Sequence, residues 1–224
     1  FIVRPDGASF TAERAEPKDA LDFFASEARW CRPVMARAGP DGALWVVDMY
    51  RYMIEHPQWL PKNGQDELRP YYRHGAQHGR IYSVFPASDA PRGWPRLQDS
   101  SPRELAGLLQ HPNGWVRDTA QQLLVQGRGL KVVEELRGIA GDGRSPLGRL
   151  HALCTLDGIG KLDVPTLENA LKDSQAGVRR QAVRLSAKMK PSLLAGFEDA
   201  DPSVRLELAV SVSRGAAILS LIHI

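Results

Sequence analysis

Cysteine, long apolar runs and clusters of like charge are all scarce in this sequence, and each absence narrows the class of protein. The two cysteines, Cys31 and Cys154, are expected in different domains as small buried residues, so no disulfide framework is predicted. No window approaches the roughly 18 uninterrupted apolar residues of a membrane-spanning helix. The net charge of +3 is spread along the chain and does not indicate a nucleic-acid partner. The composition is therefore that of an ordinary globular protein with no membrane span.

Several catalytic motifs are also missing. The sequence has no P-loop, no dinucleotide-binding GxGxxG, no GxSxG and no zinc-binding set of Cys and His. His74 and His78 have the spacing of a metal-binding pair only if they lie on a helix, and Gly75 and Gly79 disfavour a helix there. We predict neither nucleotide chemistry nor a metal site in this chain.

The most informative segment is GPDGALWVVDMYRYMIEHPQW, residues 39–59. Residues 39–42 supply the Pro and Gly of a turn between two apolar runs, 33–38 and 43–49, which predicts a β-hairpin. In the second run alternate residues share a face, so Asp48 is expected where the strand ends.

A long segment without helical or strand periodicity follows the hairpin, from Arg51 to Gln77, before a strand pattern returns at 79–85. A structureless loop of that length is unusual in a compact domain, so it indicates either a functional loop or wrong strand assignments. We favour the functional loop. Upstream, residues 2–14 predict a short hairpin, and Pro17 starts a predicted short helix that ends at Ala25.

A Pro-, Ser- and Asp-rich stretch, residues 86–102, predicts a linker. We expect a β part at 1–90, a linker at 91–101, a helical part at 102–215 and a non-native or disordered tail at 216–224. The tail resembles the translation of a sequencing adapter. The first residues resemble neither an initiator Met nor a signal peptide, so we expect an internal piece of a longer protein.

The helical part repeats a turn followed by Val-Arg and an apolar helix. The copies lie at 113–120, 175–182 and 201–208, with a degenerate copy at 148–152, and the shorter helices expected before them lie at 104–110, 130–140, 166–172 and 191–198. Recurring helix pairs resemble HEAT repeats, because one amphipathic pair cannot bury its apolar face alone. The predicted fold class is α+β and multidomain: an N-terminal antiparallel β segment followed by an α-solenoid of HEAT-like helix pairs.

The repeated Val and Arg have separate expected roles. Val116, Val178 and Val204 should be core residues at the start of each second helix. The arginines that follow them either form a basic ladder for an acidic partner or bind the inter-helix turn and an Asp of an adjacent repeat, such as Asp173 or Asp199. We favour the second role.

The pattern RPV…GPDGALWVVDMYRY.IEHP.W, closing with HGRIYSVFP, resembles the C-terminal end of the β-propeller in the membrane-bound dehydrogenase-like proteins of planctomycetes. The resemblance covers about residues 1–90. It implies a secreted oxidoreductase that joins a sugar-dehydrogenase-like propeller to HEAT repeats and a haem-binding cytochrome c domain. This chain has no CxxCH, so the haem site would lie outside it.

The resemblance implies oxidation of a sugar or related alcohol by the full-length protein, with pyrroloquinoline quinone and calcium as cofactors and electrons passing to the haem domain. The implied location is periplasmic or extracellular. This fragment alone is expected to be inactive, because a propeller needs its other blades. The competing function is a non-catalytic propeller that binds a glycan or protein, with a HEAT scaffold that recruits a partner along its concave face or merely acts as a spacer.

Candidate site residues are those that could reach one mouth of a propeller. Asp48 and His56 are the catalytic candidates. Asp48 could be a metal ligand, orient a base or simply cap the following loop, and His56 could accept a proton, be a ligand or be a structural histidine. The candidates for substrate binding are Tyr50, Arg51, Tyr52, Trp59, His78 and Arg80. For Arg80 an ion pair with Asp48 or Glu55 is the alternative. Trp45, Trp59 and Tyr72 could stack on a sugar or pack beneath the loop.

Overall fold

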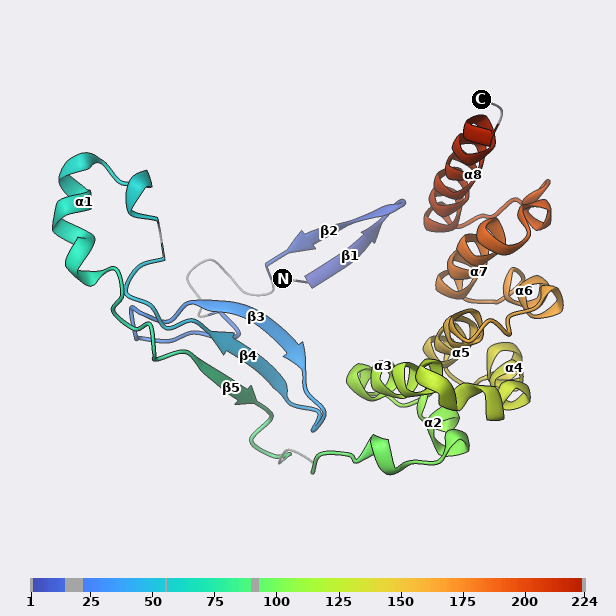
Figure 1. Ribbon diagram of the computed structural model, residues 1–224, viewed down its shortest axis with the longest axis horizontal. Coiled ribbons are helices and arrows are strands. Elements are labelled where there is room, and N and C mark those ends of the chain that lie inside the picture. Colours follow the sequence, from blue (N-terminus) through green and yellow to red (C-terminus); the bar gives the residue numbers. More distant parts are fainter. Residues whose placement is uncertain (1, 15–21, 55, 90–92, 223–224) are drawn as a thin grey trace. The chain divides into compact units, whose positions relative to one another are not determined.

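The structure is a computed structural model that describes residues 2–14, 22–54, 56–89 and 93–222, with the backbone alone at Pro57 and 214–222. It is a mixed α/β fold of small antiparallel sheets and short helices (Figure 1). The chain divides into one unit of residues 16–95 and another that contains residues 1–15 and 96–224.

The N-terminal hairpin is confirmed. Strand β1 (Ile2–Asp6) pairs with β2 (Ser9–Glu13), and Gly7 adopts a φ of 59° in the turn between them. Most of the helix predicted at 17–25 lies outside the described residues, but residues 22–25 are not helical.

The predicted strands of the second hairpin and the strand that follows form one three-stranded antiparallel sheet. Strand β4 (Leu44–Asp48) lies between β3 (Pro33–Ala38) and β5 (Arg80–Val84). Val46 and Asp48 are its buried residues, which confirms that alternate residues share a face. Asp48 is the last residue of β4 and pairs with Pro33 on one side and Arg80 on the other.

The long loop contains regular structure, so the prediction of a structureless segment was wrong. It holds η1 (Pro57–Trp59), α1 (Lys62–Leu68) and η2 (Arg69–Tyr71). Helix α1 has two turns and buries no residue, so it leaves no apolar periodicity in the sequence. Proline precedes α1, begins η1 and is the second residue of η2, positions where its missing N–H costs nothing.

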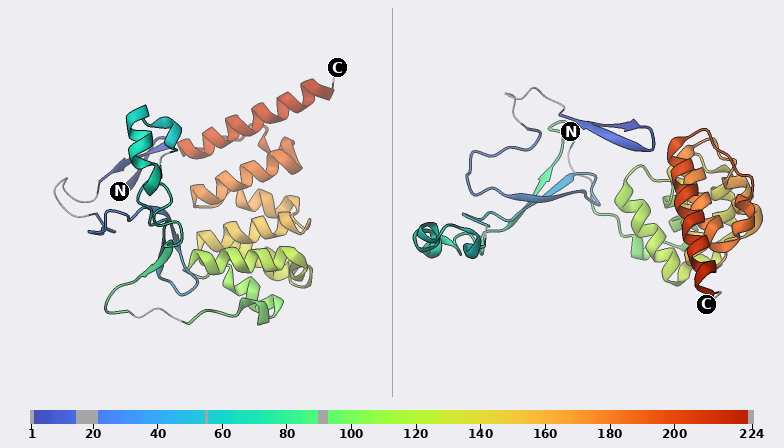
Figure 2. Two further views of the ribbon diagram at one scale, coloured as in Figure 1. Left: turned by 60° about the vertical axis from the view of Figure 1, so that its left-hand side comes forward. Right: turned by 90° about the horizontal axis from the view of Figure 1, so that it is seen from above.

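The second half of the chain is a stack of helices in two layers (Figures 1 and 2). The helices are α2 (Pro102–Leu108), α3 (Gly114–Leu123), α4 (Val133–Asp142), α5 (Pro146–Gly158), α6 (Val164–Ala170), α7 (Ala176–Met189) and α8 (Pro202–Ile222). Helices α2, α4 and α6 contact one another in one layer, and α3, α5, α7 and α8 do so in the other. Each helix of the first layer also packs against the helix that follows it, so the stack consists of successive pairs.

Side-chain caps fix where several of these helices begin. Ser101 and Glu104 form a reciprocal capping box at α2, while Asn113, Ser145 and Asp163 each accept a backbone N–H at the start of α3, α5 and α6. Gly127, with a φ of 125°, separates α3 from the one-turn helix η5 (Gly129–Lys131), so α4 begins at Val133 and not at the predicted Leu130.

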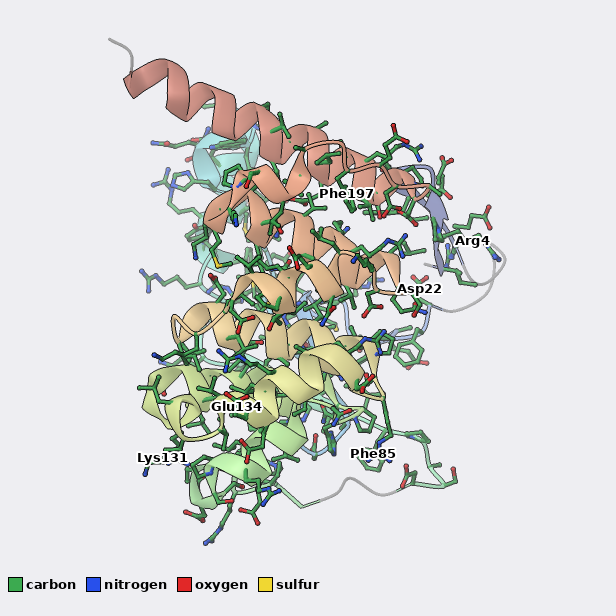
Figure 3. All side chains as sticks on the ribbon, turned by 90° about the vertical axis from the view of Figure 1, so that its right-hand side faces the viewer. Arg4, Asp22, Phe85, Lys131, Glu134 and Phe197 are labelled. Carbon is green, nitrogen blue, oxygen red and sulfur yellow. The ribbon has the colours of Figure 1, made fainter. Side chains whose placement is uncertain are left out.

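One continuous hydrophobic core runs through the stack from Leu97 to Val204. Val116, Val178 and Val204 are buried in it, as predicted. Leu97 belongs to η3 (Leu97–Asp99), and Phe197 packs against the core from the turn before α8 (Figure 3).

Two helix predictions at the C-terminal end were wrong. The helix expected at 191–198 is a single 3-10 turn, η6 (Pro191–Leu194), because Gly196 takes a φ of 70° and ends it. Helix α8 continues through 216–222, where we expected no fold, since Ala and Leu in that stretch favour a helix.

The recurring arginines bind the inter-helix turns, as the favoured alternative predicted. Nη1 of Arg117, Arg149, Arg179 and Arg205 donates to the carbonyl oxygen six residues earlier in each case. Arg149 also makes two hydrogen bonds of 2.6 and 2.8 Å to the Asp173 carboxylate of the next pair, and Arg179 makes two of 2.6 and 2.9 Å to Asp199. These interactions join neighbouring turns, which fixes the spacing of the pairs.

Candidate functional site

The candidate site lies at the end of the sheet where β4 finishes. Asp48 is flanked there by the first residues of β3 and β5, so the segments that lead into and out of the three strands meet at this edge. These segments are residues 28–32, 49–54 and 71–79. Most of the polar and aromatic side chains predicted as functional belong to them.

Asp48 is buried, with 1 % of its surface exposed. Its Oδ1 accepts the backbone N–H groups of Arg32 at 2.7 Å and Tyr50 at 2.8 Å, and its Oδ2 accepts the Tyr82 hydroxyl at 3.3 Å. Both oxygens are therefore occupied by groups that order the adjoining loops. The structure gives Asp48 the capping role that the sequence had left open beside a catalytic one.

Two opposing effects set the acidity of Asp48. Burial raises its pKa, but the hydrogen bonds from Arg32, Tyr50, Cys31 and Tyr82 outweigh burial and hold the pKa below its ordinary value. The pKa of the Cys31 thiol is raised, by its burial and by the adjacent Asp48 charge. Asp48 is thus a buried anion that orders the loops, and each of its oxygens already accepts a hydrogen bond.

The loop after Asp48 has an unusual backbone. Tyr50 adopts a φ of 47°, which is rare for a residue other than glycine. Gly75, with a φ of 85°, packs so tightly against this segment that a Cβ would lie 2.2 Å from the Tyr50 carbonyl oxygen. The backbone N–H of Tyr52 donates to the His74 carbonyl at 3.3 Å, so the two loops are joined directly.

These loops bring together a set of rings that we call the aromatic cluster: Trp30, Tyr50, Tyr52, Tyr71, His74 and His78. Trp30 lies 5.9 Å between ring centroids from both Tyr50 and Tyr52. Tyr71 lies 5.3 Å from His74 with the rings almost perpendicular. These separations and tilts are those that aromatic rings prefer.

Two arginines pack around the aromatic cluster. The Arg80 guanidinium lies 3.6 Å from the centroid of the Tyr50 ring, a cation–π contact. Its Nε donates to the His78 carbonyl, and among the described residues no ion pair joins it to Asp48. Arg51 donates to the Tyr72 carbonyl at 2.9 Å, while its Nε is buried without a partner in the described part of the chain.

His56 and Trp59 make no contact with Asp48 or the aromatic cluster among the interactions of the described residues. In the described part of the chain, His56 makes no hydrogen bond with Asp48; its Nδ1 accepts the Gln58 N–H at 3.3 Å at the start of η1. Trp59 is 86 % exposed and takes part in none of the ring contacts found among the described residues. The structure therefore does not join His56 to Asp48 as a catalytic pair, because Pro57 starts a new turn that leads the chain away.

A pocket of about 430 Å³ opens beside the aromatic cluster, lined by Trp30 and residues 73–78. Successive turns form its wall, since His74, Ala76 and His78 each donate their N–H to the carbonyl three residues earlier. Gly75 is the buried residue of this wall. We call this feature the loop pocket.

Calcium, which the family resemblance implies, does not fit the described residues. Calcium needs six to eight oxygen ligands, and in the described part of the chain no group of three His, Cys, Asp or Glu converges on one point. The carboxylate at the site, Asp48, already uses both oxygens. A quinone with its calcium would have to be held by parts of the protein other than these residues.

The sequence reasoning missed Trp30, Arg32, Tyr71 and His74 as members of the site. Trp30 lies at its centre, and the Arg32 guanidinium donates to the Tyr52 carbonyl at 3.4 Å. Neither Trp30 nor Arg32 belongs to a periodic pattern. The one signal that could have identified them was their place in the segment that resembles the propeller proteins.

Comparison with known proteins finds a family model that matches the first part of the chain. A profile described as Domain of unknown function (DUF7133) matches residues 1–88. No curated protein and no solved structure gives a significant match. The matched span includes the aromatic cluster and the loop pocket and ends before the helical stack.

In the described part of the chain, none of the helices combines the length and apolar character needed to cross a lipid bilayer.

Proposed function

We propose that the segments 28–32, 49–54 and 71–79 form a carbohydrate-binding site, in which the aromatic cluster and the loop pocket hold a sugar. The observation that carries the proposal is the convergence of six rings from three loops beside a pocket of about 430 Å³. Ring faces pack against the C–H faces of sugars, and adjacent polar groups bind the hydroxyls. A pocket of this size holds one or two sugar rings.

The loops support this proposal because they are held rigid before any ligand arrives. Asp48 orders the segments on both of its sides, and Gly75 locks the pocket wall against Tyr50. A site whose rings are already in place loses little conformational entropy on binding. This arrangement favours a structural role for Asp48 over a catalytic one, since the carboxylate is buried and each of its oxygens already accepts a hydrogen bond.

The architecture that we propose around the site is the terminal part of a β-propeller followed by a HEAT-type α-solenoid. A three-stranded sheet is small for an independent domain, and all six residues of β3 are exposed, as expected for a strand that lacks its neighbouring blade. Helices paired in two layers, with arginines that link successive turns, match the solenoid. Because of the family resemblance, we propose that the complete protein is periplasmic or extracellular.

Ring truncation tests the binding site. Trp30→Ala and Tyr71→Ala should each weaken binding of an oligosaccharide at least tenfold in calorimetric titrations of the full chain, because each removes a stacking face. Trp59→Ala is the matched control, since Trp59 is exposed outside the aromatic cluster, and should leave the affinity unchanged. Equal losses in all three variants, or no binding by the parent to a panel of neutral and acidic oligosaccharides, would contradict the proposal.

A second candidate function is oxidation of the bound sugar by the complete protein, with a quinone cofactor and electron transfer to a haem domain outside this chain. The observation that favours it is the gathering of Tyr50, Tyr52, His78 and Arg80, all predicted substrate-binding residues, at one end of the sheet. Complete protein supplied with pyrroloquinoline quinone and calcium should then reduce an artificial electron acceptor when a sugar is added. Absence of turnover across a sugar panel would leave the binding function alone.

We also propose the helical stack as a scaffold that recruits a protein partner along the layer of α3, α5, α7 and α8. That layer carries ion pairs between neighbouring helices, such as Lys188 with Asp157 and Arg184 with Glu207. Charge-reversal variants on this layer that abolish partner capture would support recruitment, and silent variants would favour a spacer role.

A further inference from the structure

The lining of the loop pocket is rich in hydrogen-bond donors and lacks carboxylates. Arg73, His74 and His78 contribute its ionisable side chains, and neither Asp nor Glu is among its described lining residues. Asp48, the carboxylate at this end of the sheet, is buried and accepts hydrogen bonds on both of its oxygens. The described side chains that line the pocket therefore carry a positive charge or none.

The Arg73 guanidinium is free to bind a ligand. It makes no hydrogen bond or ion pair with the described residues, although it is held in the turn whose Ala76 N–H donates to the Arg73 carbonyl at 3.0 Å. Of the other arginines of these loops, Arg32 and Arg51 bind carbonyl oxygens, Arg80 stacks on Tyr50, and Arg29 is not among the lining residues of the pocket. Because carbonyl oxygens and rings carry no net charge, these contacts leave the positive charges of Arg32, Arg51 and Arg80 unneutralised.

A guanidinium only donates hydrogen bonds, so its best partner only accepts them. A sugar hydroxyl both donates and accepts, whereas a carboxylate or sulfate oxygen accepts and also carries the complementary charge. We propose that the carbohydrate bound in the loop pocket is anionic, with a uronic acid carboxylate or a sulfate ester held by Arg73 while Trp30 packs on its ring. This inference rests on the proposed carbohydrate-binding function and names the substrate class of that site.

The test compares three tetrasaccharides of matched length on the full chain: galacturonic acid, neutral galactose and sulfated galactose. At least one of the two anionic ligands should bind tenfold or more tightly than the neutral one, and the preference should shrink as salt is raised, because salt screens the charge of an exposed arginine. Which anionic ligand binds distinguishes the carboxylate from the sulfate.

Substitution of Arg73 locates the charge recognition. Arg73→Gln should lose at least fivefold in affinity for the anionic ligand and a smaller factor for neutral galactose, with Arg73→Lys intermediate for the anionic ligand. Arg69→Gln is the matched control, since Arg69 lies in the same loop outside the pocket and pairs with Asp66. Near-ultraviolet circular dichroism confirms that each variant retains the loop structure.

The outcomes separate this inference from the function on which it rests. Neutral galactose bound as tightly as both anionic ligands, with binding lost in Trp30→Ala, would overturn the anionic preference and keep the carbohydrate site. The same loss in Arg73→Gln and Arg69→Gln would also overturn it. Binding of none of the three ligands would overturn both.

Discussion

At the residue scale, the site depends on one buried carboxylate and one glycine. Asp48 accepts hydrogen bonds from the chain on both sides of the sheet edge, through the N–H groups of Arg32 and Tyr50. Gly75 permits the pocket wall to approach Tyr50 more closely than any side chain would allow. Neither residue needs to touch a ligand, yet both position the residues that we propose do.

Replacing Asp48 with Asn should lower the free energy of unfolding of the unit of residues 16–95 by about 2 kcal/mol, because a charged acceptor of several hydrogen bonds is lost. Urea denaturation followed by tryptophan fluorescence measures the change. Asp66→Asn is the control, since Asp66 is exposed and its ion pair is long at 3.8 Å. An equal effect of both variants would contradict the role of Asp48.

The stability difference between the parent and Asp48→Asn should depend on pH, and the pKa of Asp48 fixes the direction of that dependence. The folded-state pKa of Asp48 lies below its ordinary value of about 3.9, so its contribution to stability is complete above pH 4 and is lost as the pH falls through the folded-state pKa. The stability difference between the parent and Asp48→Asn should therefore shrink as the pH is lowered below about 4. A difference that stays constant from pH 6 to pH 2 would show that ionisation of Asp48 does not stabilise the fold.

Gly75→Ala should destabilise the unit of residues 16–95 by about 3 kcal/mol or more and weaken ligand binding, because the new Cβ would clash with the Tyr50 carbonyl at a positive φ. Gly79→Ala is a matched control from the same loop. A Cβ there would lie 3.7 Å from the nearest atom, an ordinary contact. Thermal unfolding and near-ultraviolet circular dichroism of the two variants should differ clearly, and similar behaviour would contradict the close approach.

At the element scale, the helix pairs are joined by a ladder of arginines. Asp173 and Asp199 each sit in an inter-helix turn and accept two hydrogen bonds from the arginine of the preceding pair. Gly143 occupies the equivalent position in the preceding inter-helix turn, so that turn offers Arg117 no carboxylate. The Nε of Arg117 is buried without a partner in the described part of the chain. Two of these turns thus carry the carboxylate that binds the arginine of the preceding pair, and one turn lacks it.

Arg179→Met should lower the free energy of unfolding of the helical stack by about 3 kcal/mol, because it leaves the largely buried Asp199 carboxylate without its partner. Arg205→Met is the control: Arg205 binds two turn carbonyls in the same way and makes no carboxylate pair with the described residues, so the cost should be near 1 kcal/mol. Chemical denaturation followed by far-ultraviolet circular dichroism separates the two. Equal costs would show that the carboxylate steps do not stabilise the stack.

At the scale of the whole molecule, the helical stack and the sheet unit have separate sources of stability. The hydrophobic core cluster runs from Leu97 to Val204 and includes no residue of the unit 16–95. The sheet unit relies on Asp48, the aromatic cluster and tight loop packing. Damage to the core of the stack should therefore be confined to the helices.

Leu156→Ala tests this separation. Leu156 is fully buried in α5, and its truncation should cost about 2–5 kcal/mol and increase amide hydrogen exchange in α5 and its neighbours α4 and α7. Exchange in β3, β4 and β5 should remain unchanged. Mass spectrometry of exchanged peptides measures both, and increased exchange in the sheet would show that the two units share stability.

The sequence predicted the strands and helices more accurately than it predicted the contacts of the site. Alternation around a Gly-Pro turn identified β3 and β4, and the recurring Val-Arg pairs identified the start of each second helix together with the binding of its arginine to the turn. Helix α1 escaped because it buries nothing, and the fourth short helix failed because Gly196 ended it after one turn. Asp48 lies at the end of its strand, as predicted, but two of its partners come from residues 16 and 34 positions away and could not be read from spacing.

The sequence by itself determined the local patterns, because each of them depends on residues within a few positions. Alternation marks the strands, and capping residues and Pro mark the helix starts. The repeated Val marks the core side of each second helix, and the Arg after it binds its own turn. The tertiary structure alone decided that Trp30 meets Tyr52 and His74, that Asp48 is an occupied anion and that His56 stays apart from it. Those relations depend on how Gly75 packs against Tyr50, a contact between segments 25 residues apart that close packing enforces and no periodicity encodes.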